Sequence, residues 1–598
     1  MKLTRNRSLL GMLVSLILFF ALAIHVGAGG GQPMQPWELA QYFPADTQIY
    51  VSIRTDIGFL DQLDAFAATV TDILSTLDVP PLSVRDLIGM VGVAPEWLTW
   101  LGDAAAIGVI TLDPAQVTGA SIYAVIHLQD AASVYSLFSS LDFQGDESTL
   151  TSGSTTLQFI DDVLIVSNAE SPIALPEDNG MWEESTHFQE TTDALPADNY
   201  NALIYLDAPD LARLVSPAAT AAEMISTVPP LALGLTILDG KTYAIDAVAL
   251  APDGISPAAD SLSADFTRLI PASANAFMQA HDLSNLIEVG IQFQQQSIDS
   301  MQAQMSLFSA PMPLSTAVPP VGIRDGIVDG LRREAGIDFD ADVLSWTSGD
   351  YALFARSETR PIAEALVRGE PANRVLEGRF DFAALAQVTD ADSAARFIEK
   401  AERFMQQGIE SGRFADVTVG REMIAAVEFV TFTTPLDFNS FVEGDELPLT
   451  LVMGAANDLF YFGTPGAVAD ALDGGESIAD SDAYIAAQSV ILSDPSVMLY
   501  TDDEGLVVGL TASPFGLVDL FITRPVIGTI FRNVLDDYHR DPSLTPSPTP
   551  TPTPSPVPDV DKVLAPLDKL IAAVAHSSIS ASVDAAGTTR LRIEFTLK

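Results

Sequence analysis

The chain of 598 residues contains no cysteine. Disulfides, thiolate nucleophiles, cysteine-ligated zinc sites and iron–sulfur clusters are therefore excluded. A bacterial lipoprotein is excluded too, because its lipid is attached to a cysteine. Cations are also scarce: 29 Lys and Arg stand against 79 Asp and Glu, which gives a net charge of −50. Nucleic-acid binding needs a basic surface, so we expect no nucleic-acid partner.

Histidine is rare as well, and no two of the six histidines are spaced three or four residues apart. This spacing excludes the HExxH zinc hydrolases. The sequence also lacks a G-x-S-x-G elbow, an S-x-x-K motif and a P-loop. We therefore predict no catalytic, cofactor-binding or metal-binding residues and no cofactor. The histidines are His25, His127, His187, His281, His539 and His576.

Two acidic patterns have the composition of a possible site. Asp338, Asp340 and Asp342 alternate as at the start of a calcium loop, but positions six and twelve are Val343 and Gly349. A calcium loop needs Gly and Glu there, so a helix-capping turn is favoured. The adjacent pairs Asp161-Asp162 and Asp536-Asp537 do not predict an acid/base dyad, because neighbours in sequence rarely converge on one substrate. The first of these pairs falls where a hairpin turn is expected.

The N-terminus has the pattern of an export signal. Lys2, Arg5 and Arg7 precede an apolar run from 9 to 24, and Val26-Gly27-Ala28 offers small residues for a signal peptidase. Residues 1–28 are thus either a cleaved signal peptide or an N-terminal membrane anchor formed by 9–26. Both alternatives predict an exported protein, extracellular or in the cell envelope. Membrane contact is expected only through this segment, if it is uncleaved.

Hydrophobic residues make up 48% of the chain and charged residues 18%, which indicates a folded rather than disordered protein. Internal repetition is its most informative feature. A strand running into a helix cap ends at Asp130, and a second one ends at Asp390. The helices that follow each carry apolar residues at i, i+3, i+4 and i+7. Both acids are expected to act as N-caps.

Other pieces repeat in the same order. Trp100 with Gly102-Asp103 leads into an apolar run, as do Trp346 and Gly349-Asp350. The late hairpins at 162–166 and 458–462 also correspond, as do the openings at 43–46 and 270–273. We therefore predict an α+β fold of two related units, each an antiparallel sheet with helices packed on one face. The predicted divisions are 29–41 as a flexible exit segment, 42–264 as the first unit and 265–598 as the second.

Residues 543–556 read SLTPSPTPTPTPSP, a composition typical of an extended, solvated segment. About 40 residues follow, with one helix and two strand-like runs, which is too little to fold alone. We therefore read 541–558 as an insertion and expect the end of the chain to complete the second unit.

The order of these pieces resembles a bacterial family called domain of unknown function 3352. The resemblance rests on the export signal, the FPADTQIYVSI opening, W-x-x-G-D-x-A, the strand into a D-A-x-S helix, NDLFYF and the closing RLRIEF. It covers most of 42–598. The family brings no established activity, so the resemblance implies no catalytic residue.

Absence of motifs and the two-unit organisation favour a non-catalytic envelope protein that binds or scaffolds an unknown envelope or extracellular partner. One alternative is a carrier of an apolar or lipid-like ligand, with the Met- and Phe-containing stretch 283–308 lining its cavity. A second alternative is an extracellular hydrolase that uses Asp and Glu, because carboxylate sites leave no local motif. In the first reading, Trp97, Trp100 and Trp346 are packing anchors rather than sugar platforms.

Overall fold

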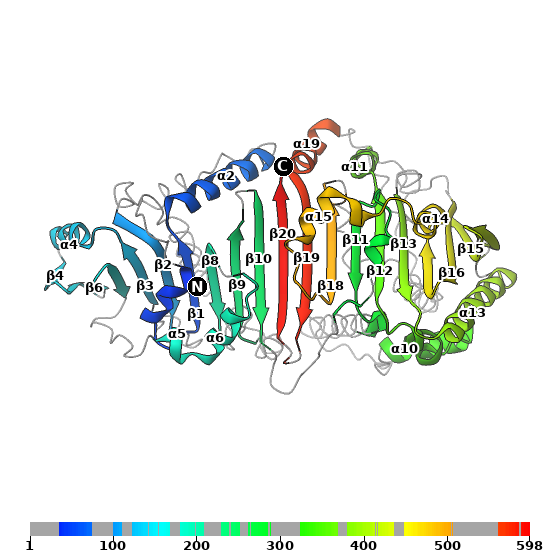
Figure 1. Cartoon of the computed structure of the whole chain (residues 1–598), viewed down its shortest axis with the longest axis horizontal. Coiled ribbons are helices and arrows are strands. Elements are labelled where there is room, and N and C mark those ends of the chain that lie inside the picture. Colours follow the sequence, from blue (N-terminus) through cyan, green and yellow to red (C-terminus); the bar gives the residue numbers. More distant parts are fainter. Residues whose placement is uncertain are drawn as a thin grey trace, which may run out of the picture. The chain divides into compact units, whose positions relative to one another are not determined.

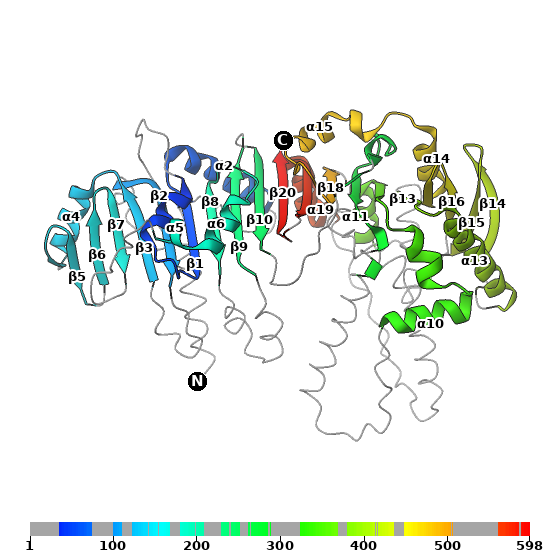
Figure 2. The ribbon, with the colours of Figure 1, turned by 60° about the horizontal axis from the view of Figure 1, so that its bottom comes forward.

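The fold is described from a computed structural model of the chain (Figures 1 and 2). Its strands are formed by segments in which apolar residues alternate with polar ones or follow one another. The predicted export signal and the Pro-rich tract lie outside the residues that it describes. The described residues are 35–74, 100–110, 122–141, 143–153, 155–167, 180–197, 199–207, 229–238, 241–250, 261–263, 265–284, 287–288, 323–368, 380–412, 414, 417–435, 448–503, 505, 560–584, 586 and 588–598.

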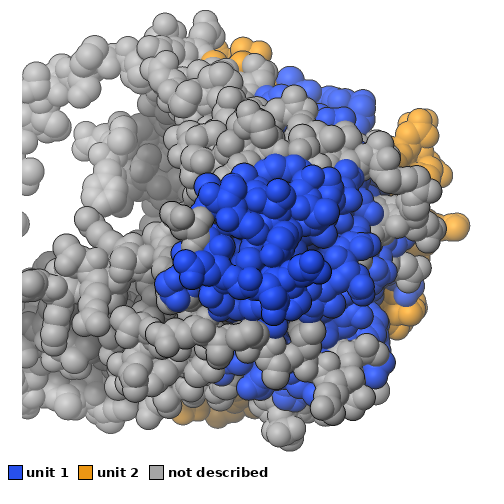
Figure 3. Space-filling model, turned by 90° about the vertical axis from the view of Figure 1, so that its left-hand side faces the viewer, with its two compact units in different colours: residues 1–260, 491–493, 572–598 blue, residues 261–490, 494–571 orange. Residues whose placement is uncertain are grey.

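The chain divides into two compact units, which are coloured separately in Figure 3. Unit 1 comprises residues 1–260, 491–493 and 572–598, and unit 2 comprises 261–490 and 494–571. The first boundary between the units falls after residue 260, close to the boundary after residue 264 that we predicted. The closing residues 572–598 belong to unit 1, whereas we expected them to complete the second unit. The reason is strand pairing, because the last strand pairs with a strand of unit 1 that lies more than 300 residues earlier.

Unit 1 contains one antiparallel sheet. Each neighbouring pair in it is antiparallel, and the order across the sheet does not follow the sequence. Across the sheet the strands are β4 (Gln144–Gly145), β5 (Thr149–Ser152), β6 (Thr155–Ile160), β7 (Val163–Ser167), β3 (Ile122–Leu128), β2 (Leu101–Val109), β1 (Ile49–Arg54), β8 (Ala202–Leu206), β9 (Leu231–Ile237), β10 (Thr242–Ala249), β20 (Thr589–Leu597) and β19 (Val574–Val583).

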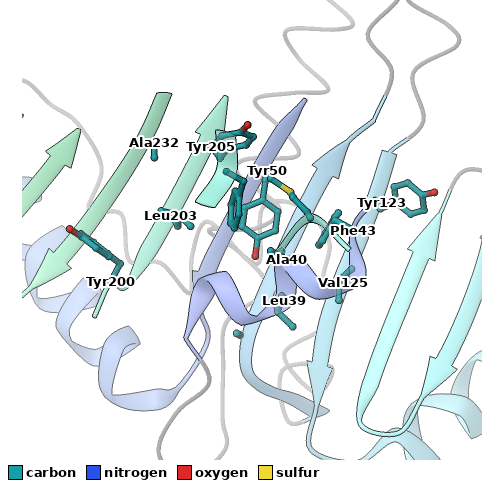
Figure 4. Close-up of a cluster of buried hydrophobic side chains, with 14 of the residues drawn as sticks. Leu39, Ala40, Phe43, Tyr50, Tyr123, Val125, Tyr200, Leu203, Tyr205 and Ala232 are labelled. Carbon is teal, nitrogen blue, oxygen red and sulfur yellow. The ribbon is translucent and has the colours of Figure 1, made fainter. Parts of the chain in front are cut away.

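Helices cover both faces of this sheet. On one face, Tyr50 packs edge-on against Phe43, with ring centroids 5.1 Å apart (Figure 4). Tyr50 also packs edge-on against Phe188, with ring centroids 5.6 Å apart. Phe43 follows η1 (Pro36–Tyr42), and Phe188 lies on α6 (Thr186–Asp193), which α5 (Met181–Glu184) precedes. On the opposite face, Val134 of α4 (Ala131–Ser140) packs with Leu164. On that face, α2 (Ile57–Leu74) contributes Phe59 to a cluster with Tyr243.

The neighbouring strands of unit 2 are antiparallel as well. Across the unit they are β18 (Val497–Asp502), β11 (Ala276–Ala280), β12 (Tyr351–Ser357), β13 (Phe380–Gln387), β17 (Leu459–Gly463), β16 (Pro448–Ala456), β15 (Val427–Pro435) and β14 (Thr418–Ile424). The remaining helical segments of the described residues are η4 (Phe266–Arg268), α10 (Ile323–Ala335), η5 (Phe339–Val343), η6 (Leu344–Trp346), α11 (Thr359–Val367), α13 (Ala391–Glu410), α14 (Pro465–Asp473), η7 (Ile478–Asp480), α15 (Asp482–Gln488) and α19 (Val560–Ala573).

Both faces of the unit 2 sheet are covered too. Phe460 of β17 contacts Phe397 of α13 and the buried Trp346, with ring centroids at 6.2 and 4.9 Å. Strand side chains alternate, so the next residue, the buried Tyr461, faces the other way. Helix α14 lies on that other face, because its Asp470 pairs with Arg356, which the strand register places on the Tyr461 side of the sheet. The expectation of helices on one face only is therefore wrong, although the mixed helix–strand class with antiparallel sheets is correct.

The predicted local signals fall where expected. Asp130 caps α4 by accepting from the Ser133 amide at 2.9 Å, and Asp390 caps α13 through the amide and hydroxyl of Ser393. Asp161 lies in the turn between β6 and β7 with a φ of 49°, a left-handed conformation that a turn requires. These outcomes confirm the predictions made from local spacing.

Candidate functional site

A histidine–carboxylate pair lies at the Gly-Asp turn that the sequence singled out in unit 2. Asp350 precedes β12 and is fully buried, and His281 follows β11. Ala280 and Tyr351 are partners in the register of the two strands, so the next residues outward, His281 and Asp350, lie beside each other. The distance from His281 Nδ1 to Asp350 Oδ1 is 2.5 Å. The histidine side chain keeps 21% of its surface exposed.

The second oxygen of Asp350 is also engaged. It accepts hydrogen bonds from the Ser263 amide at 2.6 Å and the Ser263 hydroxyl at 2.9 Å. A buried carboxylate that holds Nδ1 fixes the ring orientation of a histidine, as it does for general bases and metal-bound histidines. Here the same carboxylate also ties residues 261–263 to the start of β12. The centre is thus built like a catalytic support but also connects two segments of unit 2.

A second buried polar centre lies in unit 1, on neighbouring strands β10 and β20. Asp246 is fully buried, and Arg592 is its direct register partner. Arg592 donates to both carboxylate oxygens, from Nε at 2.6 Å and from Nη2 at 2.7 Å. Tyr200 also donates its hydroxyl to Asp246, at 2.7 Å, and accepts from the Ala197 amide at 2.8 Å. A bidentate pair is the strong geometry for arginine and carboxylate.

Electrostatics follow from this burial. Hydrogen bonding to Asp246 holds the pKa of Arg592 above its ordinary value, and burial opposes this rise only in part. Burial is also the main reason why the pKa of Tyr200 is raised, and the negative charge of Asp246 adds to it. Both effects keep Arg592 charged and Tyr200 protonated over the whole physiological range.

Glu594 forms the adjoining part of this centre and is fully buried as well. Its Oε2 accepts from the hydroxyl of Ser578 at 3.0 Å, and its Oε1 from the hydroxyl of Thr596 at 2.5 Å. His576 Nε2 lies 3.5 Å from Oε1. Thr596 in turn shares a hydrogen bond with Thr242 of β10 at 3.1 Å. Because Glu594 is opposite Ala244 and Arg592 is opposite Asp246, all of these groups face the same side of the sheet.

Serine, histidine and glutamate therefore meet in this centre, but not in the order of a nucleophile relay. In a relay the serine bonds to the histidine, and the acid orients the histidine. Here the Ser578 hydroxyl donates to Glu594, which stands between the other two. The three residues are also buried, with at most 6% of their surface exposed. This geometry indicates a structural network and does not favour the hydrolase alternative.

The other acids and histidines named from the sequence are also engaged in the fold. Asp338 accepts from the Ala341 amide at 3.1 Å, as a cap does, and Asp342 is buried against Lys400 Nζ at 2.5 Å. His127 Nδ1 accepts from the Asp103 amide at 3.0 Å. Within the described residues, no group of three or more His, Asp or Glu is placed to hold a metal ion. His25, His539, Trp97 and Asp536-Asp537 lie outside the described residues.

Sequence reasoning missed the Asp246–Arg592 pair. The partners are 346 residues apart, so no local spacing connects them. One signal was available: Asp246 interrupts the apolar strand TYAIDAVA, and Glu594 lies between the apolar residues Ile593 and Phe595. A charged residue in the middle of such a strand is rarely buried unless it is paired. That rule points to a buried partner but does not say which.

Comparisons with known proteins give little further information. No protein-family model matches the chain, and no curated protein matches it. Two solved structures, crystal forms III and I of TP0453, share 9% and 8% sequence identity with it. Each match spans 38% of this chain. It spans 83% of the TP0453 chain in form III and 81% in form I. Their TM-scores are 0.20 and 0.19, which are too low to support an argument about fold or function. Among the described residues, no helix is long and apolar enough to cross a membrane.

Proposed function

We propose that the protein is an exported, non-catalytic protein of the cell envelope or extracellular space that binds or scaffolds a partner there. One observation carries this proposal: each buried carboxylate of the described residues is engaged by donors of the chain itself. Arg592 pairs with Asp246, Lys400 with Asp342 and His281 with Asp350, while hydroxyl groups bind Glu594. Carboxylates committed in this way hold strands and helices together and are not presented to a substrate.

Within this proposal the two units are related copies of one fold. Strand order supports the relation: the order β8-β1-β2-β3-β7-β6-β5-β4 in unit 1 matches β18-β11-β12-β13-β17-β16-β15-β14 in unit 2. Register supports it as well. Ile49 pairs with Val109 as Ala276 pairs with Ala355, and Tyr123 pairs with Ser167 as Ala383 pairs with Gly463. These pairs are spaced as the repeated sequence motifs are.

Corresponding side chains also make corresponding contacts. Asp130 bonds Ser133, and Asp390 bonds Ser393, each at the start of the helix that follows the third strand of its unit. Two units of one fold present two related surfaces, which suits a protein that bridges or arrays partners. The resemblance to domain of unknown function 3352 agrees with this organisation and adds no activity.

Location is tested through the mature N-terminus. The protein is purified from fractions of its own host, and its first residue is determined by mass spectrometry. Gly29 as the first residue indicates a cleaved signal and release, whereas an intact Met1 in the membrane fraction indicates an anchor. Recovery of the full chain mainly from the cytosol would refute export in either form.

Native mass spectrometry of the same preparation tests the binding role. The expected result is the bare chain or a stoichiometric complex with another protein. A co-purifying lipid would overturn the scaffold proposal in favour of the apolar-ligand carrier, whose expected lining 283–308 lies mostly outside the described residues. Turnover of a glycan or ester that is lost in Asp246→Asn and Glu594→Gln, while both variants keep the thermal unfolding midpoint of the exposed control variant Met423→Ser, would favour the hydrolase.

A further inference from the structure

The C-terminal hairpin, which we define as residues 574–598 with strands β19 and β20, completes unit 1 from a remote part of the chain. Strand β20 pairs with β10 from Thr242↔Thr596 to Ala249↔Thr589 without a break in register. Phe595 stacks on Tyr243 with ring centroids 5.1 Å apart, and Phe66 of α2 packs at 5.9 Å from the Phe595 ring. The edge of β10 is therefore a binding surface for a strand with a defined sequence (Figure 1).

Polar contacts make this surface selective. Arg592 can be buried only opposite an acidic residue. Asp246 is that residue, because it is the register partner of Arg592 and accepts its hydrogen bonds. Arg590 donates to the carbonyl of Ala194, the C-cap residue of α6, at 3.0 Å. A slip of one residue would turn Arg592 to the opposite face and leave Asp246 buried without its cation, which is costly. A strand with another sequence would thus bind poorly.

Charge also distinguishes the hairpin from the rest of the chain. It carries Arg590, Arg592 and Lys598 against Asp584 and Glu594, so its side chains are close to neutral. The whole chain has a net charge of −50. The hairpin can therefore approach an acidic unit 1 with little repulsion, whether that unit belongs to its own chain or to another copy.

The connection that precedes α19 and the hairpin is long in sequence. Residues 503–559 separate β18 of unit 2 from α19, which leads directly into β19. Exchange of an identical element preserves all of its contacts, which makes it a low-cost route to a dimer. We propose that the β10 edge of one copy accepts the C-terminal hairpin of a second copy, so that Arg592 of each chain pairs with Asp246 of the other in a strand-exchanged dimer.

The absence of cysteine allows a clean test with the full chain. Ala247 and Leu591 are register partners on β10 and β20 and are only partly buried. One tagged chain carries Ala247→Cys and a differently tagged chain carries Leu591→Cys; the two are co-expressed, purified and oxidised. Strand partners lie at disulfide distance, so exchange predicts a covalent heterodimer. The collision control replaces Leu591→Cys by Met423→Cys, an exposed position in unit 2.

The proposal is supported if Ala247→Cys forms a covalent heterodimer with Leu591→Cys and none with Met423→Cys. A single chain with both Ala247→Cys and Leu591→Cys shows that the cysteines can react. If this chain forms its internal disulfide while the two single-cysteine chains stay monomeric, exchange is overturned. Failure of the internal disulfide would overturn the register on which the proposal depends. Light scattering of the unmodified chain gives a further readout that no substitution affects: exchange predicts a fraction of twice the monomer mass.

Discussion

Asp246 and Arg592 form a bidentate ion pair between adjacent strands although 346 residues separate them in sequence. The pair fixes where the end of the chain returns into unit 1, because each residue is the register partner of the other. The whole of unit 2 lies between them in sequence. Unit 1 therefore cannot complete its sheet before β20 has been made and, if the protein is exported, has crossed the membrane.

Removing one partner of this pair should destabilise unit 1 strongly. In Arg592→Met, Asp246 stays buried without its cation, a change that costs about 3–5 kcal/mol in comparable pairs. Hydrogen exchange of the β10 and β20 amides should then accelerate by about 100-fold or more, because opening free energy sets the exchange rate of protected amides. Mass spectrometry of deuterated peptides measures this directly, with β12 of unit 2 as the internal reference.

The matched control removes both charges. Asp246→Leu combined with Arg592→Met leaves no buried ion, and replacing a buried pair by apolar residues is often close to neutral. Exchange in the double variant should thus be slower than in Arg592→Met alone. Equal acceleration in both would show that packing around Arg592, rather than its charge, holds the strand.

Two glycines three residues apart should respond in opposite directions to alanine. A Cβ at Gly463 of β17 would lie 2.2 Å from the Phe382 carbonyl oxygen on the paired strand, so backbone atoms would have to move. Gly463→Ala should lower the stability of unit 2 by about 1–3 kcal/mol. At Gly466, in the first turn of α14, the nearest atom would lie 3.9 Å away, and Gly466→Ala should be neutral or stabilising by up to about 1 kcal/mol. Thermal unfolding midpoints of the two variants provide the comparison.

The sequence was sufficient for what local spacing determines. The caps at Asp130 and Asp390, the strands that lead into them and the turn at Asp161 were predicted because each depends on residues a few positions apart. The reading of Trp346 as a packing anchor was also correct, since it is buried and donates its indole N–H to the Asp342 carbonyl.

The predictions that were wrong concern contacts between segments that are distant in sequence. The closing strand β20 has no local feature that distinguishes β10 from any strand of unit 2 as its partner. Helices were expected on one face, yet Tyr461 and Phe460 are neighbours that contribute to opposite buried faces. Apolar runs such as Ala104 to Ile107 carry this information, because a strand that is apolar at successive positions is covered on both sides.

The cap of α13 should weaken in acid. Hydrogen bonds from Ser393 hold the pKa of Asp390 below its ordinary value of 3.8. A carboxylate whose pKa is lowered by folding contributes stability above its unfolded pKa, and this contribution is lost as the pH falls through the lower folded value. Exchange of the first-turn amides of α13 should therefore become less protected below about pH 4. Asp390→Asn keeps a capping oxygen but does not titrate, so its protection, corrected for intrinsic exchange, should stay constant over the same range.

Variants of the His281–Asp350 pair in unit 2 can distinguish a structural role of this pair from a catalytic one. If Asp350 mainly connects segments, Asp350→Leu should expose the amides of 261–263 and of the start of β12, because Ser263 and His281 both lose their acceptor. Ser263→Ala should cost only about 1 kcal/mol, since the Ser263 amide still donates to Asp350. His281→Gln, which retains a donor near the same position, should leave the exchange of β12 almost unchanged. A variant at His281 that kept the fold but abolished a measured turnover would contradict the non-catalytic proposal, because a positioned imidazole would then be acting on a substrate.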